Sequence, residues 1–160
     1  KWLEFERVLI LSLRLPTHQE GAALELWLLL RKAGRGAAGP PATYNLGMTR
    51  ERLTFVIAAY NEALALPCLH PRLCAVLDAM PDVEGHILYV DDGSHDGTWE
   101  VIAGLTQADA RVSAPKLSRN FGKEAALTAG LDLVREGAAM ILDADGQDPP
   151  ELVLQFVARW

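Results

Sequence analysis

The run LTFVIAA at residues 53–59, followed at once by the polar triplet Tyr60-Asn61-Glu62, predicts the fold of this chain. The run is short, continuously apolar and contains β-branched and aromatic side chains, which is typical of a strand buried on both faces of a sheet. Polar residues directly after such a strand lie at the edge of the sheet where the strand ends. Working outward from this strand, the pattern of an apolar run and a polar cluster recurs toward the C-terminus.

Strands alternate with helices over this part of the chain. We expect three further apolar strands, at residues 87–90, 112–117 and 138–142. We expect helices at residues 73–80, 98–107, 124–135 and 152–160. Pro115 makes the strand at 112–117 the weakest, because proline cannot donate a ladder hydrogen bond. The alternation predicts an α/β fold with a mostly parallel sheet and right-handed crossover connections.

Each expected strand ends in a polar cluster. In addition to residues 60–62, these clusters are 91–94, 118–123 and 143–145. Ligands of open parallel sheets bind beyond the carboxyl ends of the strands. A single polar binding site explains four clusters at one edge most simply, and ordinary turn chemistry at each cluster is the alternative.

The segment Asp143-Ala144-Asp145 is the clearest candidate for chemistry. In an extended segment residues i and i+2 point the same way, so the two carboxylates repel each other unless a cation lies between them. Hard oxygen ligands suit Mg²⁺ or Mn²⁺, and Gln147 continues the spacing with a carbonyl oxygen. Such a metal keeps positions open for a substrate diphosphate. The alternative is a solvated acidic loop that ends in a helix cap at residues 148–151.

Other polar residues at the same edge suit a nucleotide. Asp91 and Asp92 offer carboxylates to a base N–H or to ribose hydroxyls; the alternative is a turn before the next helix. Arg119 and Lys123 offer cationic donors to phosphate; the alternative is a solvated basic turn. Tyr60 offers a ring that stacks on a base, or it covers the sheet edge.

Composition and missing motifs exclude several other classes of protein. The 160 residues are 50% apolar and carry a net charge of −6, which suits a globular domain and disfavours nucleic acid as a partner. No apolar run is long enough to span a bilayer. The glycine-rich signatures of P-loop and dinucleotide-binding proteins are absent. Cys68, His70 and Cys74 fit no common zinc spacing, so we expect buried thiols and a surface histidine.

Four segments together resemble the family 2 glycosyltransferases. They are VIAAYNE at 56–62, VDDGSHDGT at 90–98, LSRNFGKEAA at 117–126 and ILDADGQDPPE at 141–151. The last two are most similar to the polyprenyl-phosphate branch, which includes dolichol-phosphate mannose synthases and bactoprenol glucosyltransferases. The resemblance implies a Rossmann-like GT-A sheet that binds a nucleotide-sugar together with Mg²⁺ or Mn²⁺.

The resemblance also implies roles for individual residues. The implied nucleotide-sugar site comprises Tyr60, Glu62, Asp91, Asp92, Arg119, Lys123 and Ala144. The implied metal ligands are Asp143, Gln147 and, as the principal one, Asp145. Gly146 stands where the family usually has Leu, which implies a more flexible metal loop. No catalytic base is assigned, because a lipid phosphate acceptor is already anionic at neutral pH.

The chain divides near Met48. Residues 1–47 form an N-terminal appendage and linker of unknown role, in which the apolar runs 8–15 and 22–30 suit short helices. Residues 48–160 form the donor-binding domain, which by resemblance is incomplete at its C-terminus. Members of the branch continue into an acceptor half and often membrane segments. We therefore expect the full-length protein at the cytoplasmic face of a membrane.

The resulting hypothesis is a metal-dependent enzyme that transfers a sugar from a UDP- or GDP-linked donor to an acceptor, with polyprenyl or dolichyl phosphate as the expected acceptor. One alternative is an inactive fragment that retains at most nucleotide binding. A second is a sugar nucleotidyltransferase, although such an enzyme carries a glycine-rich basic loop where this chain has Tyr60-Asn61-Glu62.

Overall fold

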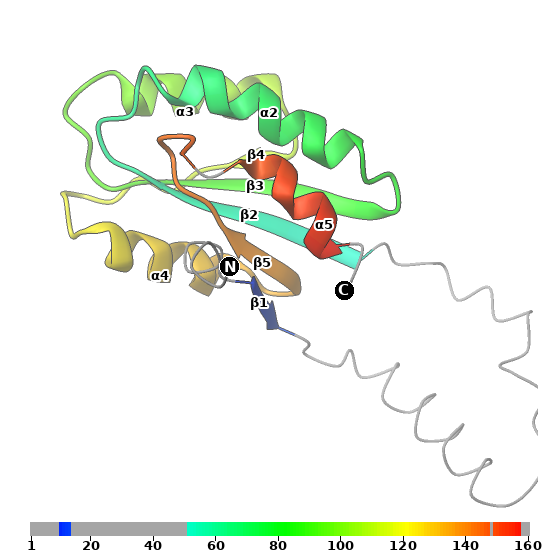
Figure 1. Cartoon of the computed structure of the whole chain (residues 1–160). Helices are drawn as coiled ribbons and strands as arrows, with labels where there is room; N and C mark the ends of the chain where they lie inside the picture. The colour runs from blue at the N-terminus through cyan, green and yellow to red at the C-terminus, as the bar shows by residue number, and fades with distance from the viewer. Residues whose placement is uncertain (1–9, 14–50, 148, 158–160) are drawn as a thin grey trace, which may run out of the picture. The chain divides into compact units, whose positions relative to one another are not determined.

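The computed structural model describes residues 10–13, 51–147 and 149–157 (Figure 1). The strands are β1 (Ile10–Leu13), β2 (Glu51–Ala59), β3 (Val83–Asp91), β4 (Val112–Ser113) and β5 (Gly137–Ile141). The helices are α2 (Leu66–Asp78), α3 (Thr98–Ala108), α4 (Lys123–Leu133), the 3-10 turn η1 (Pro150–Leu152) and α5 (Val153–Val157). None of the helices within the described residues is long and apolar enough to cross a membrane.

The described strands form one sheet in the order β1-β5-β2-β3-β4. β2 lies in the middle and is parallel to both of its neighbours, with Glu51 opposite Val83 of β3 and Leu53 opposite Ala138 of β5. β4 is parallel to β3, whereas β1 is antiparallel to β5. The four parallel strands confirm the predicted α/β fold. Their carboxyl ends lie on one side of the sheet, which we call the carboxyl edge.

Helices cover both faces of the sheet, so the strands are apolar on both sides. α2, α3 and α5 lie on one face and α4 lies on the other (Figure 1). Along β2 the side chains of Phe55 and Ile57 join the core under α2 and α3, while Val56 joins the smaller core under α4. This alternation follows from the two-residue period of a strand. It explains why the run at 53–59 is continuously apolar.

α2 begins at Leu66, well before the start predicted at residue 73. The prediction was wrong because it treated the prolines as helix breakers. Pro67 lies in the first turn, where the backbone N–H has no helical partner in any case. Pro71 removes one hydrogen bond from the helix interior, but α2 continues because its apolar face, with Leu69 and Leu73, is buried against the sheet.

Two other predicted segments differ from expectation. The strand expected at 112–117 is reduced to β4 and a single bridge between Asp91 and Lys116, because Pro115 interrupts the ladder between them. The short helix expected at 8–15 is wrong at Ile10–Leu13, which pairs with β5 as a strand. The run 22–30 lies outside the described residues. The strand predicted at 87–90 is confirmed but begins four residues earlier, as β3. The helix predicted at 152–160 is confirmed over α5, which η1 precedes, and residues 158–160 lie outside the described part. The remaining predicted strands and helices are confirmed with shifts of one or two residues at their ends.

Candidate functional site

The carboxyl edge of the sheet carries an open hollow of about 580 Å³, its mouth included. We call it the acidic hollow. Its lining comprises Ala58, Ala59, Tyr60, Glu62, Asp92, Asn120, Gly122, Lys123, Asp143, Ala144 and Asp145. These residues lie at the end of β2, after β2, β3 and β5, and at the start of α4. The hollow is therefore formed by segments far apart in the sequence.

Hydrogen bonds from backbone N–H groups to side-chain oxygens join the segments that follow β2 and β3. The N–H of Asn61 donates to Ser94 Oγ at 3.0 Å, and the N–H of His95 donates to Asn61 Oδ1 at 3.0 Å. The N–H of Glu62 donates to Thr98 Oγ1 at 2.8 Å. Asn61 adopts a left-handed backbone conformation with a φ of 58°, which asparagine tolerates better than most residues. These contacts fix the side of the hollow that carries Tyr60 and Glu62.

Asp92 holds the loop before α4 in place. Its Oδ1 accepts the N–H of Phe121 at 2.8 Å, and its Oδ2 accepts the N–H of Gly122 at 2.9 Å. The next residue, Gly93, has a φ of +67°, and a Cβ there would lie 2.4 Å from the backbone carbon of Arg119. Asp92 is therefore a positioning residue for this loop. Sequence reasoning missed that role, although the glycine after Asp92 is the signal of a close backbone approach.

Asp91 lies behind the hollow rather than in its lining. It is fully buried, and its Oδ1 accepts the N–H of Ser94 at 3.2 Å. Its Oδ2 has no hydrogen-bond partner among the described residues, and the nearest cation is Lys116 Nζ at 3.7 Å. Lys116 in turn lies over the ring of Trp99, 5.2 Å from its centroid. Asp91 is thus a buried carboxylate at the end of β3 that does not line the hollow.

The acidic triplet follows β5, and its backbone forms a turn at Ala144 and Asp145 instead of the extended segment that we expected. Ala144 is buried at 5% exposure and joins the main core, and all three residues of the triplet belong to the lining of the hollow. Asp143 Oδ1 lies 2.6 Å from Lys123 Nζ, and Asp145 Oδ1 accepts the N–H of Gln147 at 2.9 Å. The turn from Asp145 to Gln147 contains Gly146, whose φ of +71° is unfavourable for a branched side chain such as leucine.

Negative charge gathers in the acidic hollow. Burial raises the pKa of Glu62, and the carboxylates of Asp145 and Asp96 raise it further. Lys123 is the cation in the lining, and it already pairs with Asp143. Oxygen donors that repel one another are a suitable ligand set for a hard divalent cation. The side chains of Asp143 and Asp145 therefore fit Mg²⁺ or Mn²⁺.

Most predicted site residues meet in this hollow, and three do not. Tyr60, Glu62, Asp92, Lys123, Asp143, Ala144 and Asp145 all belong to its lining. Asp91, Arg119 and Gln147 are not in the lining. The Arg119 guanidinium lies over the ring of Phe121, 4.0 Å from its centroid, and donates to the carbonyl of Asn120. The alternative for Asp91 and Asp92 was a turn that leads into the next helix. Part of it is confirmed, because the carboxylate of Asp96 accepts the N–H of Thr98 at the start of α3.

The cysteines and His70 lie differently from the prediction. Cys68 is exposed, and Cys74 is only partly buried. His70 is buried in α2, where its Nδ1 lies 3.1 Å from the hydroxyl of Tyr89. The prediction of buried thiols and a surface histidine was wrong because α2 begins seven residues earlier than expected, which turns His70 toward the sheet.

Comparison with known proteins identifies the family to which the chain belongs. Residues 54–160 match the family described as glycosyl transferase family 2. The chain is 38% identical over 107 residues to the uncharacterized glycosyltransferase YkcC of Bacillus subtilis and 42% identical over 108 residues to sll0501 of Synechocystis. It is 34% identical over 109 residues to the bactoprenol glucosyl transferase of Shigella phage SfX. These matches cover 67–68% of this chain and 33–35% of the relatives, so the chain spans about a third of their length.

Solved structures share the fold. The mannosyltransferase PcManGT of Pyrobaculum calidifontis, in complex with GDP-Man and Mn²⁺, is 23% identical with a TM-score of 0.58, over 88% of this chain and 40% of that one. TarS of S. aureus in complex with UDP is 19% identical with a TM-score of 0.52, over 67% of this chain and 31% of that one. The fold, the polar carboxyl edge and a family match over more than half of the residues agree. The chain belongs to glycosyl transferase family 2.

Proposed function

We propose that this chain is the donor-binding part of a metal-dependent glycosyltransferase, and that the acidic hollow binds the nucleoside diphosphate of an activated sugar. One observation carries the proposal: Asp143 and Asp145 face the same hollow as Tyr60, Lys123 and the loop that Asp92 holds. Asp143 and Asp145 would hold Mg²⁺ or Mn²⁺. When bound, the cation neutralises charge on the diphosphate that departs from the sugar.

The chain's own residues bind and orient the donor. Lys123 pairs with Asp143 in the structure, and it extends from the first residue of α4, so its ammonium can turn toward a phosphate when a cation occupies the acidic triplet. Tyr60 is 40% exposed and offers its ring to a base, with His95 edge-on at 6.4 Å between ring centroids. Arg119 borders the same loop and reaches a phosphate only by leaving Phe121. Glu62 adds negative charge beside Asp145 and strengthens the demand for a cation.

Polyprenyl phosphate is the acceptor that we propose for the whole protein. The supporting observation is the identity to bactoprenol glucosyl transferases and to an undecaprenyl-phosphate 4-deoxy-4-formamido-L-arabinose transferase of Aeromonas hydrophila. A phosphate acceptor is anionic near neutral pH and attacks without a strong general base. The whole protein would work at the cytoplasmic face of a membrane.

Calorimetric titration of the chain with UDP-glucose and GDP-mannose, with and without Mn²⁺, tests the donor site. We expect one nucleotide to bind in Mn²⁺ and to bind at least about tenfold more weakly in chelator, which corresponds to about 1.4 kcal/mol. Absence of binding by either nucleotide supports the inactive fragment instead. Release of pyrophosphate from a nucleoside triphosphate and a sugar phosphate supports a nucleotidyltransferase.

A further inference from the structure

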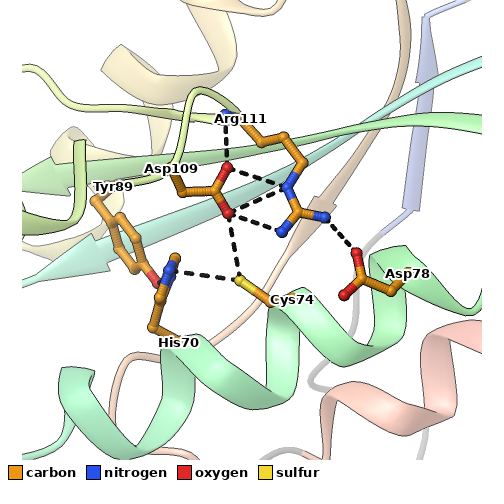
Figure 2. A network of polar contacts seen from close by, with 6 residues as sticks. All are labelled: His70, Cys74, Asp78, Tyr89, Asp109 and Arg111. Carbon is orange, nitrogen blue, oxygen red and sulfur yellow. Dashed lines mark hydrogen bonds and ion pairs between the residues drawn. The ribbon is translucent and has the colours of Figure 1, made fainter. Parts of the chain in front are cut away.

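A second group of metal-binding side chains lies in the helix layer, outside the lining of the acidic hollow. His70 and Cys74 project from successive turns of α2, and Asp109 follows the end of α3 (Figure 2). Cys74 Sγ lies 3.4 Å from His70 Nε2 and 3.5 Å from Asp109 Oδ2, and the three donor atoms all lie within 4.8 Å of one another. We call these three residues the His70 cluster.

The spacing of the donor atoms suits a tetrahedral ion. Zinc binds sulfur at about 2.3 Å and nitrogen or oxygen at about 2.0–2.2 Å, so ligand atoms at tetrahedral angles lie roughly 3.3–3.6 Å apart. The two separations that involve Cys74 Sγ already have this length. One side chain of each type, imidazole, thiolate and carboxylate, favours zinc over Mg²⁺ or Mn²⁺.

The surroundings of His70 complete the arrangement that metal-binding histidines require. His70 Nδ1 lies 3.1 Å from the buried hydroxyl of Tyr89. When Nδ1 carries the proton and donates it to that hydroxyl oxygen, the lone pair of Nε2 points toward Cys74. An outer hydrogen bond on the second ring nitrogen fixes the ring of a metal-binding histidine. Burial lowers the pKa of His70, so the imidazole is neutral, as a ligand must be.

Charge balance also suits a divalent ion. The guanidinium of Arg111 lies between two carboxylates, with Nη1 at 2.6 Å from Asp78 and Nη2 at 2.7 Å from Asp109 (Figure 2). These three side chains together carry one net negative charge. A thiolate at Cys74 adds a second, which matches the charge of Zn²⁺. Arg111 orients Asp109, whose Oδ2 accepts from both Nη2 and Nε of the guanidinium, at 2.7 and 3.1 Å. The negative charge of Asp78 leaves the group of three side chains with one net negative charge for a cation.

We propose that His70 Nε2, Cys74 Sγ and Asp109 Oδ2 bind one zinc ion, with water as the fourth ligand, and that the ion joins α2 to the end of α3. Binding breaks the S–H bond of Cys74 and forms the S–Zn bond, and the thiol proton passes to solvent. The proton of the neutral imidazole occupies Nδ1. No oxidant or reductant takes part.

The alternative role for this cluster, a thiol nucleophile, is less favourable. Burial raises the pKa of the Cys74 thiol, so without metal the sulfur is protonated and unreactive. Asp109 contacts Cys74 rather than the imidazole, so it does not orient His70 as a base. Metal coordination, in contrast, deprotonates a thiol directly.

Cobalt(II) replaces zinc as a spectroscopic probe and tests the proposal in the full chain. A Co²⁺–thiolate bond gives a charge-transfer band in the near ultraviolet that oxygen ligands do not give. We expect this band to saturate at one Co²⁺ per chain and to disappear when zinc is added. The sequence has two cysteines, so the band in a Cys68→Ser variant must come from Cys74.

The variants separate this site from the acidic hollow. We expect the band to persist in Cys68→Ser and in Asp145→Ala, and His70→Gln to weaken Co²⁺ affinity at least about tenfold. Cys74→Ser removes the band, and circular dichroism shows whether that variant is folded. The proposal is overturned if the wild-type chain gives no band, or if the band is lost in Cys68→Ser. Neither result bears on nucleotide binding, so failure here leaves the donor site to its own test.

Discussion

The acidic hollow and the His70 cluster both contain aspartate carboxylates, but the electrostatic surroundings of these carboxylates are opposite. In the hollow, burial raises the pKa of Glu62, and repulsion by the nearby carboxylate of Asp145 raises it further. In the cluster, the hydrogen-bonded guanidinium of Arg111 holds the pKa of Asp109 well below its usual range. Repelled carboxylates gain from a cation that arrives with substrate, whereas a paired carboxylate already stabilises the fold. The contrast predicts that changes in the hollow alter binding and changes in the cluster alter stability.

Asp145→Ala tests the binding half of this contrast with the largest expected effect. Removing the proposed principal metal ligand should reduce Mn²⁺-dependent nucleotide affinity by at least about 100-fold, since loss of a mere outer partner already costs 10- to 100-fold. The thermal midpoint should not fall, because one of the repelling charges is gone. Calorimetry measures the affinity, with the exposed Asp132→Ala on α4 as a matched control. Equal affinity of both variants in Mn²⁺ would count against the metal site.

Asp92→Asn asks whether the loop before α4 must be held for binding. The amide offers one acceptor oxygen to two N–H groups, those of Phe121 and Gly122, so one of the two hydrogen bonds is lost. A hydrogen bond to a charged group contributes about 1.5–3 kcal/mol. We expect nucleotide affinity to fall by about tenfold or more. A loss confined to stability, with affinity unchanged in folded protein, would refute the positioning role for binding.

Asp109→Asn tests the stability half of the contrast. In metal-free protein the substitution breaks the ion pair with Arg111, whose side chain keeps Asp78 as its other partner. We expect the free energy of unfolding to fall by about 1–3 kcal/mol, measured with urea in the presence of chelator. Nucleotide affinity in Mn²⁺ should stay within about twofold, because Asp109 lies outside the hollow. A large loss of affinity in this variant would break the separation of the two regions.

Lys123→Met has the smallest expected effect, and it tests whether the Lys123 ammonium contributes to nucleotide binding in the hollow. Methionine keeps much of the apolar stem and removes the ammonium that pairs with Asp143. An exposed pair of this kind contributes about 0–1 kcal/mol to stability, so the fold should be unaffected. We expect Mn²⁺ alone to bind slightly more tightly and the nucleotide–Mn²⁺ complex to bind a few-fold more weakly. Calorimetry of both ligands distinguishes this pattern from a uniform loss.

The sequence predicted the parallel sheet and its polar edge because each strand is apolar on both faces and is followed at once by polar residues. Phe55, Val56 and Ile57 show why: cores on both sides of β2 leave no solvent-facing position to interrupt the run. Asp143 and Asp145 were predicted to lie together from the two-residue period of extended backbone. Although Ala144 and Asp145 form a turn, the two aspartates do line the same hollow. Their metal-binding role stays a prediction until the titrations are done.

Other features depended on contacts that no local pattern carries. The start of α2 was missed because burial of Leu69 and Leu73 outweighs the cost of Pro71. The partner of Cys74 was missed because Asp109 lies 35 residues away, a separation unlike any familiar ligand spacing. Asp92 was predicted to face a ligand, but its two backbone partners come from a loop 29 and 30 residues further on.

The outer strand β4 bears on how the protein behaves in concentrated solution. A sheet border with a long row of unpaired backbone groups serves as a template on which further molecules assemble into aggregates. β4 has only two residues, and Pro115 prevents its extension. It therefore offers few backbone N–H and C=O groups with which a strand of a second molecule can pair. β4 itself is therefore a poor template for intermolecular strand addition.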